Sequence, residues 1–204
     1  MRDIFALFLL ALELPGPLFW LAVHPATRFW RRYPRATYYL LGPAIWLAVA
    51  LALIGGRSWW LAERFSRHWA VALAGVVFLL AGILLTRHVR RALGWRALLG
   101  LPQLFARWWP GRLVVSGPYE WLRHPRYLAM MLTWWGAVLV SGATRLVYLV
   151  VGMSLLAWFV TELEERELLS RFGAEYASYR QRVPRFLPFA GRLGRELRSQ
   201  QSRG

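Results

Sequence analysis

The amino-acid sequence predicts an all-α integral membrane protein with about five transmembrane helices. Of its 204 residues, 57% are hydrophobic, and they come in long blocks instead of amphipathic patterns. A helix needs about 20 consecutive apolar residues to cross a bilayer, and several blocks approach that length. Arginine-rich segments separate the blocks, which is where membrane proteins carry their cationic side chains.

The basic residues are all arginine, and they give a formal net charge of +16. In a soluble protein such a charge would indicate a nucleic-acid partner. Here the arginines lie between apolar blocks, so we expect them to set the topology and to meet anionic lipid headgroups. The chain has no cysteine, and its four histidines lack the spacing of a local ligand pair. Neither a disulfide framework nor a metal centre is therefore expected.

The first predicted helix covers residues 4–23 and is interrupted by the run Glu13-Leu14-Pro15-Gly16-Pro17. Proline removes backbone donors, so we expect a kink or a break there. The arginines of residues 28–35 favour a retained anchor over a cleaved signal peptide. Glu13 is an ionisable group at membrane depth, and two interpretations stay open. It has a functional role, or it caps the broken backbone or pairs with a neighbouring arginine.

Two further spans are expected at residues 38–56 and 69–85. Residues 58–68 between them form an aromatic connector of mixed charge, as is typical of a membrane interface. The longest polar stretch follows at residues 87–126. Within it, residues 95–105 have interfacial character and residues 108–111 predict a turn.

The last two apolar blocks, residues 128–140 and 146–160, predict a helical hairpin. The first block is short for a full span, so a tilted or re-entrant hairpin remains an alternative to two full spans. Five spans place the termini on opposite sides. Because most arginines lie in the first loop, the third loop and the tail, we expect the N-terminus outside and the C-terminus in the cytoplasm, in the inner membrane of a prokaryote. The tail after residue 191 is polar and expected to be frayed.

The first polar motif surrounds the start of this hairpin. Gly117-Pro118 predicts a turn, and Pro125 suits the first turn of the following helix. His124 would then lie at the N-terminus of that helix, where backbone N–H groups favour an anionic ligand, and Arg123 adds positive charge. This favours a carboxylate- or phosphate-binding corner. The alternative is a plain helix start with interfacial anchors.

The second polar motif follows the hairpin. It begins with a glutamate cluster, in which Glu164 and Glu165 are adjacent, so one can face the bundle while the other faces water or an arginine. The alternative is a solvated helical face with Glu162–Arg166 and Glu167–Arg171 pairs. Gly173 predicts the end of that helix. The tyrosines and arginine that follow suit stacking on an adenine-like ring and pairing with a carboxylate.

Together the two motifs resemble the isoprenylcysteine carboxyl methyltransferase family, whose wider relatives include the membrane phospholipid N-methyltransferases. The resemblance covers roughly residues 113–190. In the first motif the matching residues are Gly117, Pro118, Tyr119, Trp121, Arg123, His124, Pro125 and Tyr127. In the second they are Glu164, Glu165, Leu168, Phe172, Gly173, Tyr176, Tyr179, Arg182, Val183, Pro184, Leu187 and Pro188.

This resemblance implies S-adenosylmethionine as the cofactor, bound in a cytoplasmic pocket without a Rossmann domain, and a lipophilic acceptor that enters from the bilayer. The pocket is expected to be built by the first motif, the ends of the hairpin and the C-terminal segment. The expected cofactor-binding residues are Gly117, Tyr119, His124, Pro125, Tyr127, Glu164, Glu165, Tyr176, Tyr179, Arg182 and Pro184. The expected catalytic residues are Arg123, His124, Tyr127 and Glu165.

The predicted organisation is therefore a membrane platform at residues 1–112, a methyltransferase unit at 113–190 and a polar tail at 191–204. Two positions depart from the family pattern, and the second of them leaves the acceptor open among a carboxylate, an amine and a thiol. Ala129 stands where the family often has glycine. Val160 stands where the eukaryotic isoprenylcysteine enzymes carry an arginine before the paired glutamates.

Two other function classes remain as alternatives. An NADPH-dependent membrane reductase of the steroid or sterol type has a similar C-terminal design. However, that pattern has asparagine where this chain has Arg126, and it has Phe-Gly-Glu where this chain has Leu128-Ala129-Met130. A non-enzymatic membrane scaffold would leave the glutamate pair and the tyrosine spacing unexplained.

Overall fold

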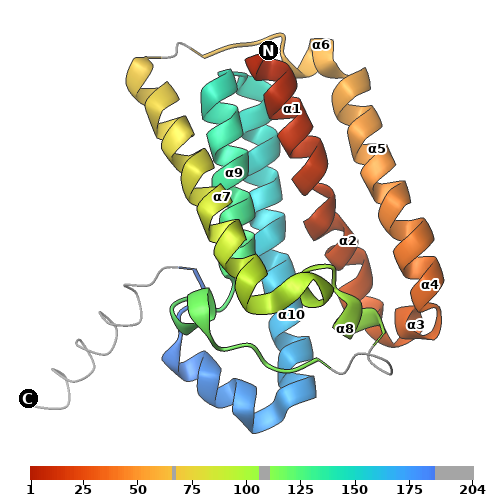
Figure 1. The fold of residues 1–204 in the computed structure, drawn as a ribbon. Helices are drawn as coiled ribbons and strands as arrows, with labels where there is room; N and C mark the ends of the chain where they lie inside the picture. The colour runs from red at the N-terminus through yellow and green to blue at the C-terminus, as the bar shows by residue number, and fades with distance from the viewer. Residues whose placement is uncertain (66–67, 106–110, 187–204) are drawn as a thin grey trace, which may run out of the picture.

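The computed structural model describes residues 1–65, 68–105 and 111–186, which form an all-helical bundle (Figure 1). Its long segments are α1 (Arg2–Glu13) with α2 (Pro15–Val23), α5 (Gly42–Gly55), α7 (Trp69–Leu98), α9 (Pro125–Ser141) and α10 (Thr144–Arg182). Short helical turns join them: η1 (His24–Ala26), α3 (Thr27–Arg32), α4 (Pro34–Ala36), η2 (Thr37–Leu41), α6 (Arg57–Trp60), α8 (Leu101–Leu104) and η3 (Gly117–Glu120). The predicted turn at residues 108–111 falls mostly outside the described residues, as does the tail.

Within the described residues, four stretches are long and apolar enough to cross a membrane: Arg2–Arg32, Pro34–Gly55, Trp69–Leu98 and Thr144–Arg182. The expectation of an all-α integral membrane protein is therefore confirmed. The fifth segment, α9, has 17 residues. At about 1.5 Å per residue it is about 25 Å long, a little less than the hydrocarbon core.

The interruption of the first predicted helix lies at Leu14, between α1 and α2. Leu14 keeps helical dihedral angles, and Pro15 occupies the first position of α2, where its missing N–H leaves no hydrogen bond unmade. Trp46 of α5 donates its indole N–H to the carbonyl of Leu12 at 3.1 Å. The carboxylate of Glu13 has one buried oxygen, Oε2, with no hydrogen-bond partner among the described residues.

Helix α7 continues to Leu98, well past the predicted end of the third span at residue 85. The residues that follow, 86–98, are mostly arginine, alanine and leucine, which are good helix formers, so the helix continues although the arginines interrupt the apolar block. The axis breaks only at Gly94, whose φ of +73° is in the left-handed region.

Helices α7 and α9 pack with their backbones in contact, because three glycines remove the side chains between them. A Cβ atom on Gly136 of α9 would lie 2.7 Å from the backbone nitrogen of Leu79. Gly75 and Gly82 of α7 are similarly close to α9. Helix α9 also contacts α1 and α10 and buries Trp134 completely, so it forms the centre of the bundle.

Helix α10 changes direction at Gly173, where the predicted helix end lies. Gly173 has φ +52° and ψ −124°, a conformation that is largely restricted to glycine. The helix then resumes as far as Arg182, and Figure 1 shows this last part turning away from the bundle axis. The turn places the tyrosines of the second motif beside the first motif.

Candidate active site

A cavity of about 380 Å³ lies at the end of the bundle remote from the N-terminus (Figure 1). Its volume is within the range of roughly 300–1,000 Å³ that small-molecule sites occupy. Its walls come from α2, η1, the end of α7, residues 111–114, η3, the start of α9 and the lower part of α10. The lining residues are Trp20, His24, Leu93, Arg96, Ala97, Gly111, Arg112, Leu113, Val114, Tyr119, Arg123, His124, Arg126, Tyr127, Glu164, Leu168, Arg171, Phe172, Tyr176 and Tyr179.

Most of the predicted site residues line this one cavity, although they come from two motifs about forty residues apart in the chain. They are Tyr119, Arg123, His124, Tyr127, Glu164, Tyr176 and Tyr179. The lining combines aromatic surfaces, cationic groups and one carboxylate. The cavity also takes residues from outside the predicted unit of residues 113–190.

The remaining predicted residues are not in the described lining of the cavity. Gly117 starts η3 with φ +63°, and its N–H donates to Glu120 at 3.1 Å. Pro125 is buried at the first position of α9. Arg182 is exposed and donates to the carbonyl of Ser178 at 3.3 Å. The contact of these residues with a cofactor stays a prediction.

His124 is held between the two adjacent glutamates. It is the N-cap residue of α9, as the sequence predicts, and is only 4% exposed. Its Nε2 lies 3.0 Å from Glu165 Oε1, and its Nδ1 lies 3.7 Å from Glu164 Oε2. Glu164 is partly exposed in the cavity, whereas Glu165 is completely buried behind it.

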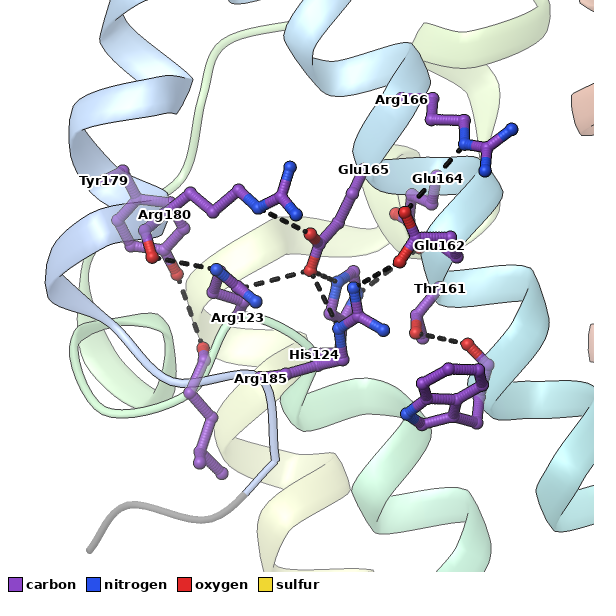
Figure 2. A network of polar contacts seen from close by, with 12 residues as sticks. Arg123, His124, Thr161, Glu162, Glu164, Glu165, Arg166, Tyr179, Arg180 and Arg185 are labelled. Carbon is purple, nitrogen blue, oxygen red and sulfur yellow. Dashed lines mark hydrogen bonds and ion pairs between the residues drawn. The ribbon is translucent and has the colours of Figure 1, made fainter. Parts of the chain in front are cut away.

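Glu165 is the centre of an ionic network that closes the floor of the site (Figure 2). Besides His124, three arginines approach its carboxylate: Arg123 at 3.1 Å, Arg180 at 3.2 Å and Arg185 at 3.1 Å. Arg185 also donates to Glu162 at 2.6 Å. A buried carboxylate is tolerable only with such partners, because desolvation disfavours an isolated charge. Glu165 therefore joins the first motif, α10 and the segment after α10.

Backbone hydrogen bonds fasten the segment after α10 directly to the first motif. The N–H of Arg123 donates to the carbonyl of Pro184 at 2.9 Å, and the N–H of His124 donates to that of Arg185 at 3.2 Å. The hydroxyl of Tyr179 donates to the carbonyl of Tyr119 at 2.7 Å. Pro184 therefore holds Arg123 in position through its backbone carbonyl.

Two tyrosines of the lining, Tyr119 and Tyr176, carry hydroxyl groups that can donate a hydrogen bond to a ligand. The Tyr176 hydroxyl is buried, and no residue in the described part of the chain gives it a hydrogen-bond partner. For Tyr119, burial and the neighbouring Glu164 carboxylate raise the pKa of the phenol well above its usual range. It therefore stays protonated and keeps a proton to donate.

The structure also brings in residues that sequence reasoning missed. His24 lines the cavity, and its Nδ1 lies 2.8 Å from Glu167 Oε2. Arg31 contacts the other oxygen of Glu167 at 2.8 Å. Glu167 stood out only as a member of the glutamate cluster, and the predicted Glu167–Arg171 pair is present at 3.7 Å. No sequence spacing connects His24 with a partner 143 positions away.

The lining suits a cofactor with an amino-acid group and a purine. Arginines at the wall can pair with a carboxylate, and Glu164 can accept hydrogen bonds from an ammonium or from hydroxyls. The tyrosines and Phe172 offer ring faces for stacking. The unpaired Tyr176 hydroxyl is a buried group that a ligand would satisfy. In the described part of the chain, no cluster of three or more His, Cys, Asp or Glu side chains could hold a metal ion.

Comparison with known proteins connects this site with methyltransferases. The methanethiol S-methyltransferase 1 of Bradyrhizobium diazoefficiens is 36% identical over 86 residues, 39% of this chain and 27% of the relative. The human protein-S-isoprenylcysteine O-methyltransferase is 39% identical over 83 residues, 38% of this chain and 28% of the relative. The methanethiol S-methyltransferase of Mycobacterium tuberculosis is 26% identical over 184 residues, 81% of this chain and 70% of the relative.

The first two matches therefore span little more than a quarter of those relatives' length. No solved structure gives a significant match. The sequence model of the phospholipid methyltransferase family matches residues 69–175, which run from the start of α7 past the Gly173 turn and make up just over half of the chain. The resemblance carried by the two motifs is thus confirmed, and the chain belongs to the phospholipid methyltransferase family.

Proposed function

We propose that the protein is an S-adenosylmethionine-dependent methyltransferase that acts on a lipophilic acceptor at the cytoplasmic face of the membrane. The observation that carries the proposal is that both family motifs contribute side chains to one cavity at the end of an apolar bundle. A pocket at that position would be accessible to a polar cofactor from water and to an acceptor from the bilayer.

The cofactor would be held by the aromatic and charged lining. Tyr119, Tyr176 and Tyr179 would surround the purine, and Glu164 would face its hydroxyls or its ammonium group. When bound, S-adenosylmethionine supplies an electrophilic methyl group on a sulfonium. The protein's own contribution is to align the acceptor and to exclude water, since positioning and desolvation can supply most of the rate enhancement of such a displacement.

His124 has the central positioning role in this proposal. Its ring is fixed by the buried Glu165 on one side and faces Glu164 on the other. The three arginines around Glu165 hold that carboxylate, so the ring and the N-terminus of α9 stay in one orientation. Loss of the imidazole would leave Glu165 with one partner fewer and remove one wall of the cavity.

A thermal-shift titration tests the proposal. A ligand that binds only the folded state stabilises it by about 2.7 kcal/mol at a hundredfold excess over Kd. We expect S-adenosylhomocysteine to raise the unfolding midpoint of the purified protein in detergent, and His124→Ala to abolish that rise. NADPH is the control ligand. Stabilisation by NADPH alone would instead support a reductase function. No stabilisation by either ligand would count against both the methyltransferase and the reductase function.

A further inference from the structure

His24 gives the cavity a second histidine, on the side formed by the N-terminal helix. It lies at the end of α2, outside the residues that the family model matches. Its side chain is 2% exposed and lines the same cavity as His124 and Tyr127. The indole of Trp20 stacks on the imidazole with a centroid distance of 5.0 Å and an interplanar angle of 27°, so the ring is held in place.

The contact with Glu167 determines which nitrogen of His24 carries a proton. Nδ1 lies 2.8 Å from Glu167 Oε2. An ionised carboxylate only accepts hydrogen bonds, so Nδ1 must be the donor. In the neutral ring the lone pair is then on Nε2, which has no hydrogen-bond partner among the described residues. A carboxylate that orients a histidine in this way is a recurring arrangement for a general base.

The negative charge of Glu167 is already compensated without a proton on Nε2 of His24. Arg31 contacts Glu167 Oε1 at 2.8 Å, and Arg171 lies 3.7 Å from the same oxygen. Two guanidinium groups already face this single carboxylate, so it does not need an imidazolium to neutralise it. When the ring gains a proton, the carboxylate stabilises the new charge at short range.

We propose that His24, oriented by Glu167, is the proton acceptor of the methyl transfer, and that the acceptor substrate is therefore a thiol or an amine and not a carboxylate. This inference rests on the proposed methyltransferase function. One bond from the acceptor atom to hydrogen breaks, and one N–H bond forms at Nε2. The electron pair left on the acceptor atom forms the bond to the methyl carbon, and the pair of the broken carbon–sulfur bond stays on sulfur.

A thiol suits this arrangement better than an amine. Typical pKa values are about 6.5 for an imidazole, about 8.5 for a thiol and about 10.4 for an alkylammonium. Proton transfer to an ordinary imidazole is thus unfavourable by about 100-fold from a thiol and by about 10,000-fold from an ammonium. The arginines of the lining, Arg126 and Arg171 among them, would also stabilise a thiolate. A carboxylate acceptor is already ionised and has no proton to lose, so His24 would have no function in its methylation.

Turnover of three acceptors with ten carbon atoms each, decanethiol, decylamine and decanoate, tests the inference. With S-adenosylmethionine, we expect the wild-type protein to methylate decanethiol or decylamine, and His24→Ala to lower that rate by about 100-fold or more. His24→Ala should still be stabilised by S-adenosylhomocysteine. The matched control is His88→Ala, which changes an exposed histidine of α7 outside the described lining.

These outcomes separate the two proposals. Methylation of decanoate alone, unaffected by His24→Ala, would overturn the inference and leave the methyltransferase intact. Full turnover of decanethiol or decylamine by His24→Ala would also overturn it. If S-adenosylhomocysteine does not stabilise the wild-type protein, the proposed function itself fails.

Nitrogen-15 NMR of histidine-labelled protein tests the dyad without turnover. The chain has four histidines, and the spectrum of His24→Ala identifies the signals of His24. In the complex with S-adenosylhomocysteine, we expect the proton on Nδ1 and the lone pair on Nε2, and we expect the Nε2 signal to change when decanethiol binds beside it. A ring that is already doubly protonated before decanethiol is added would mean a plain ion pair with Glu167 and would overturn the inference. A proton on Nε2 in the neutral ring would do the same.

Discussion

The hydroxyl groups of Tyr176 and Tyr179, three residues apart in α10, have different surroundings. Removing each of them should therefore change the stability of the protein differently. The Tyr176 hydroxyl is buried without a hydrogen-bond partner in the described structure. We expect Tyr176→Phe to leave the unfolding midpoint of the free protein unchanged or slightly higher, since an unsatisfied buried group is removed. If that hydroxyl binds the cofactor, the affinity for S-adenosylhomocysteine should fall by about tenfold, as for the loss of one hydrogen bond.

Tyr179→Phe is the matched control, measured with the same titration. It removes the bond to the carbonyl of Tyr119 at 2.7 Å, so we expect the free protein to lose about 1 kcal/mol of stability. Equal destabilisation by the two variants would contradict the assignment of the Tyr176 hydroxyl as a ligand-binding group.

At the same scale, sequence reasoning could place some site residues but not their partners. The N-cap position of His124 follows from local chemistry, because Pro125 favours the first position of a helix. Which of Glu164 and Glu165 faces the cavity could not be predicted, since that depends on the rotation of α10 against its neighbours. The His24–Glu167 contact joins residues 143 positions apart, and only the assembled bundle brings them together.

At the scale of single helices, the two glycines of α10 allow a test of the turn at Gly173. A Cβ atom added at Gly173 would meet no other atom within 4 Å, so the effect of Gly173→Ala is conformational. Since φ is +52° and ψ is −124°, we expect a cost of about 1–3 kcal/mol. The tyrosines of the site follow this turn, so the affinity for S-adenosylhomocysteine should fall as well.

Gly152→Ala provides the comparison in the same helix. Gly152 is helical and also has open space around its Cβ position, so we expect alanine there to stabilise the helix by up to about 1 kcal/mol. Thermal unfolding of both variants in detergent measures the difference. A Gly173→Ala protein as stable as Gly152→Ala would show that the turn is not a conformational requirement.

The helices themselves were predictable to different degrees. The apolar blocks indicated the spans, because length and hydropathy are local properties of the chain. The continuation of α7 to Leu98 was not predicted, since its arginine-rich end has helix propensity but no apolar pattern. Gly173 was recognised as a helix end, whereas the resumption of helix up to Arg182 depends on the tertiary contacts of Tyr176 and Tyr179.

At the scale of the whole molecule, the proposed orientation puts the cavity on the cytoplasmic side. The N-terminus lies at the opposite end of the bundle from the cavity (Figure 1). Because most of the arginines belong to the cavity end, we expect a C-terminal fusion to a reporter enzyme that is active only outside the cell to be inactive. The same reporter fused to the N-terminus should be active. The reverse pattern would place the cavity outside and contradict the proposed supply of a cytoplasmic cofactor.

The backbone pairing of residues 123–124 with residues 184–185 also determines when the site is complete during synthesis of the chain. His124 and Arg123 leave the ribosome well before their partners, Pro184 and Arg185, which follow the last membrane helix. A nascent chain that has inserted every span therefore still lacks one side of its site. Under the proposed function, capture of the cofactor would follow membrane insertion, and a half-inserted chain would gain no stability from S-adenosylmethionine.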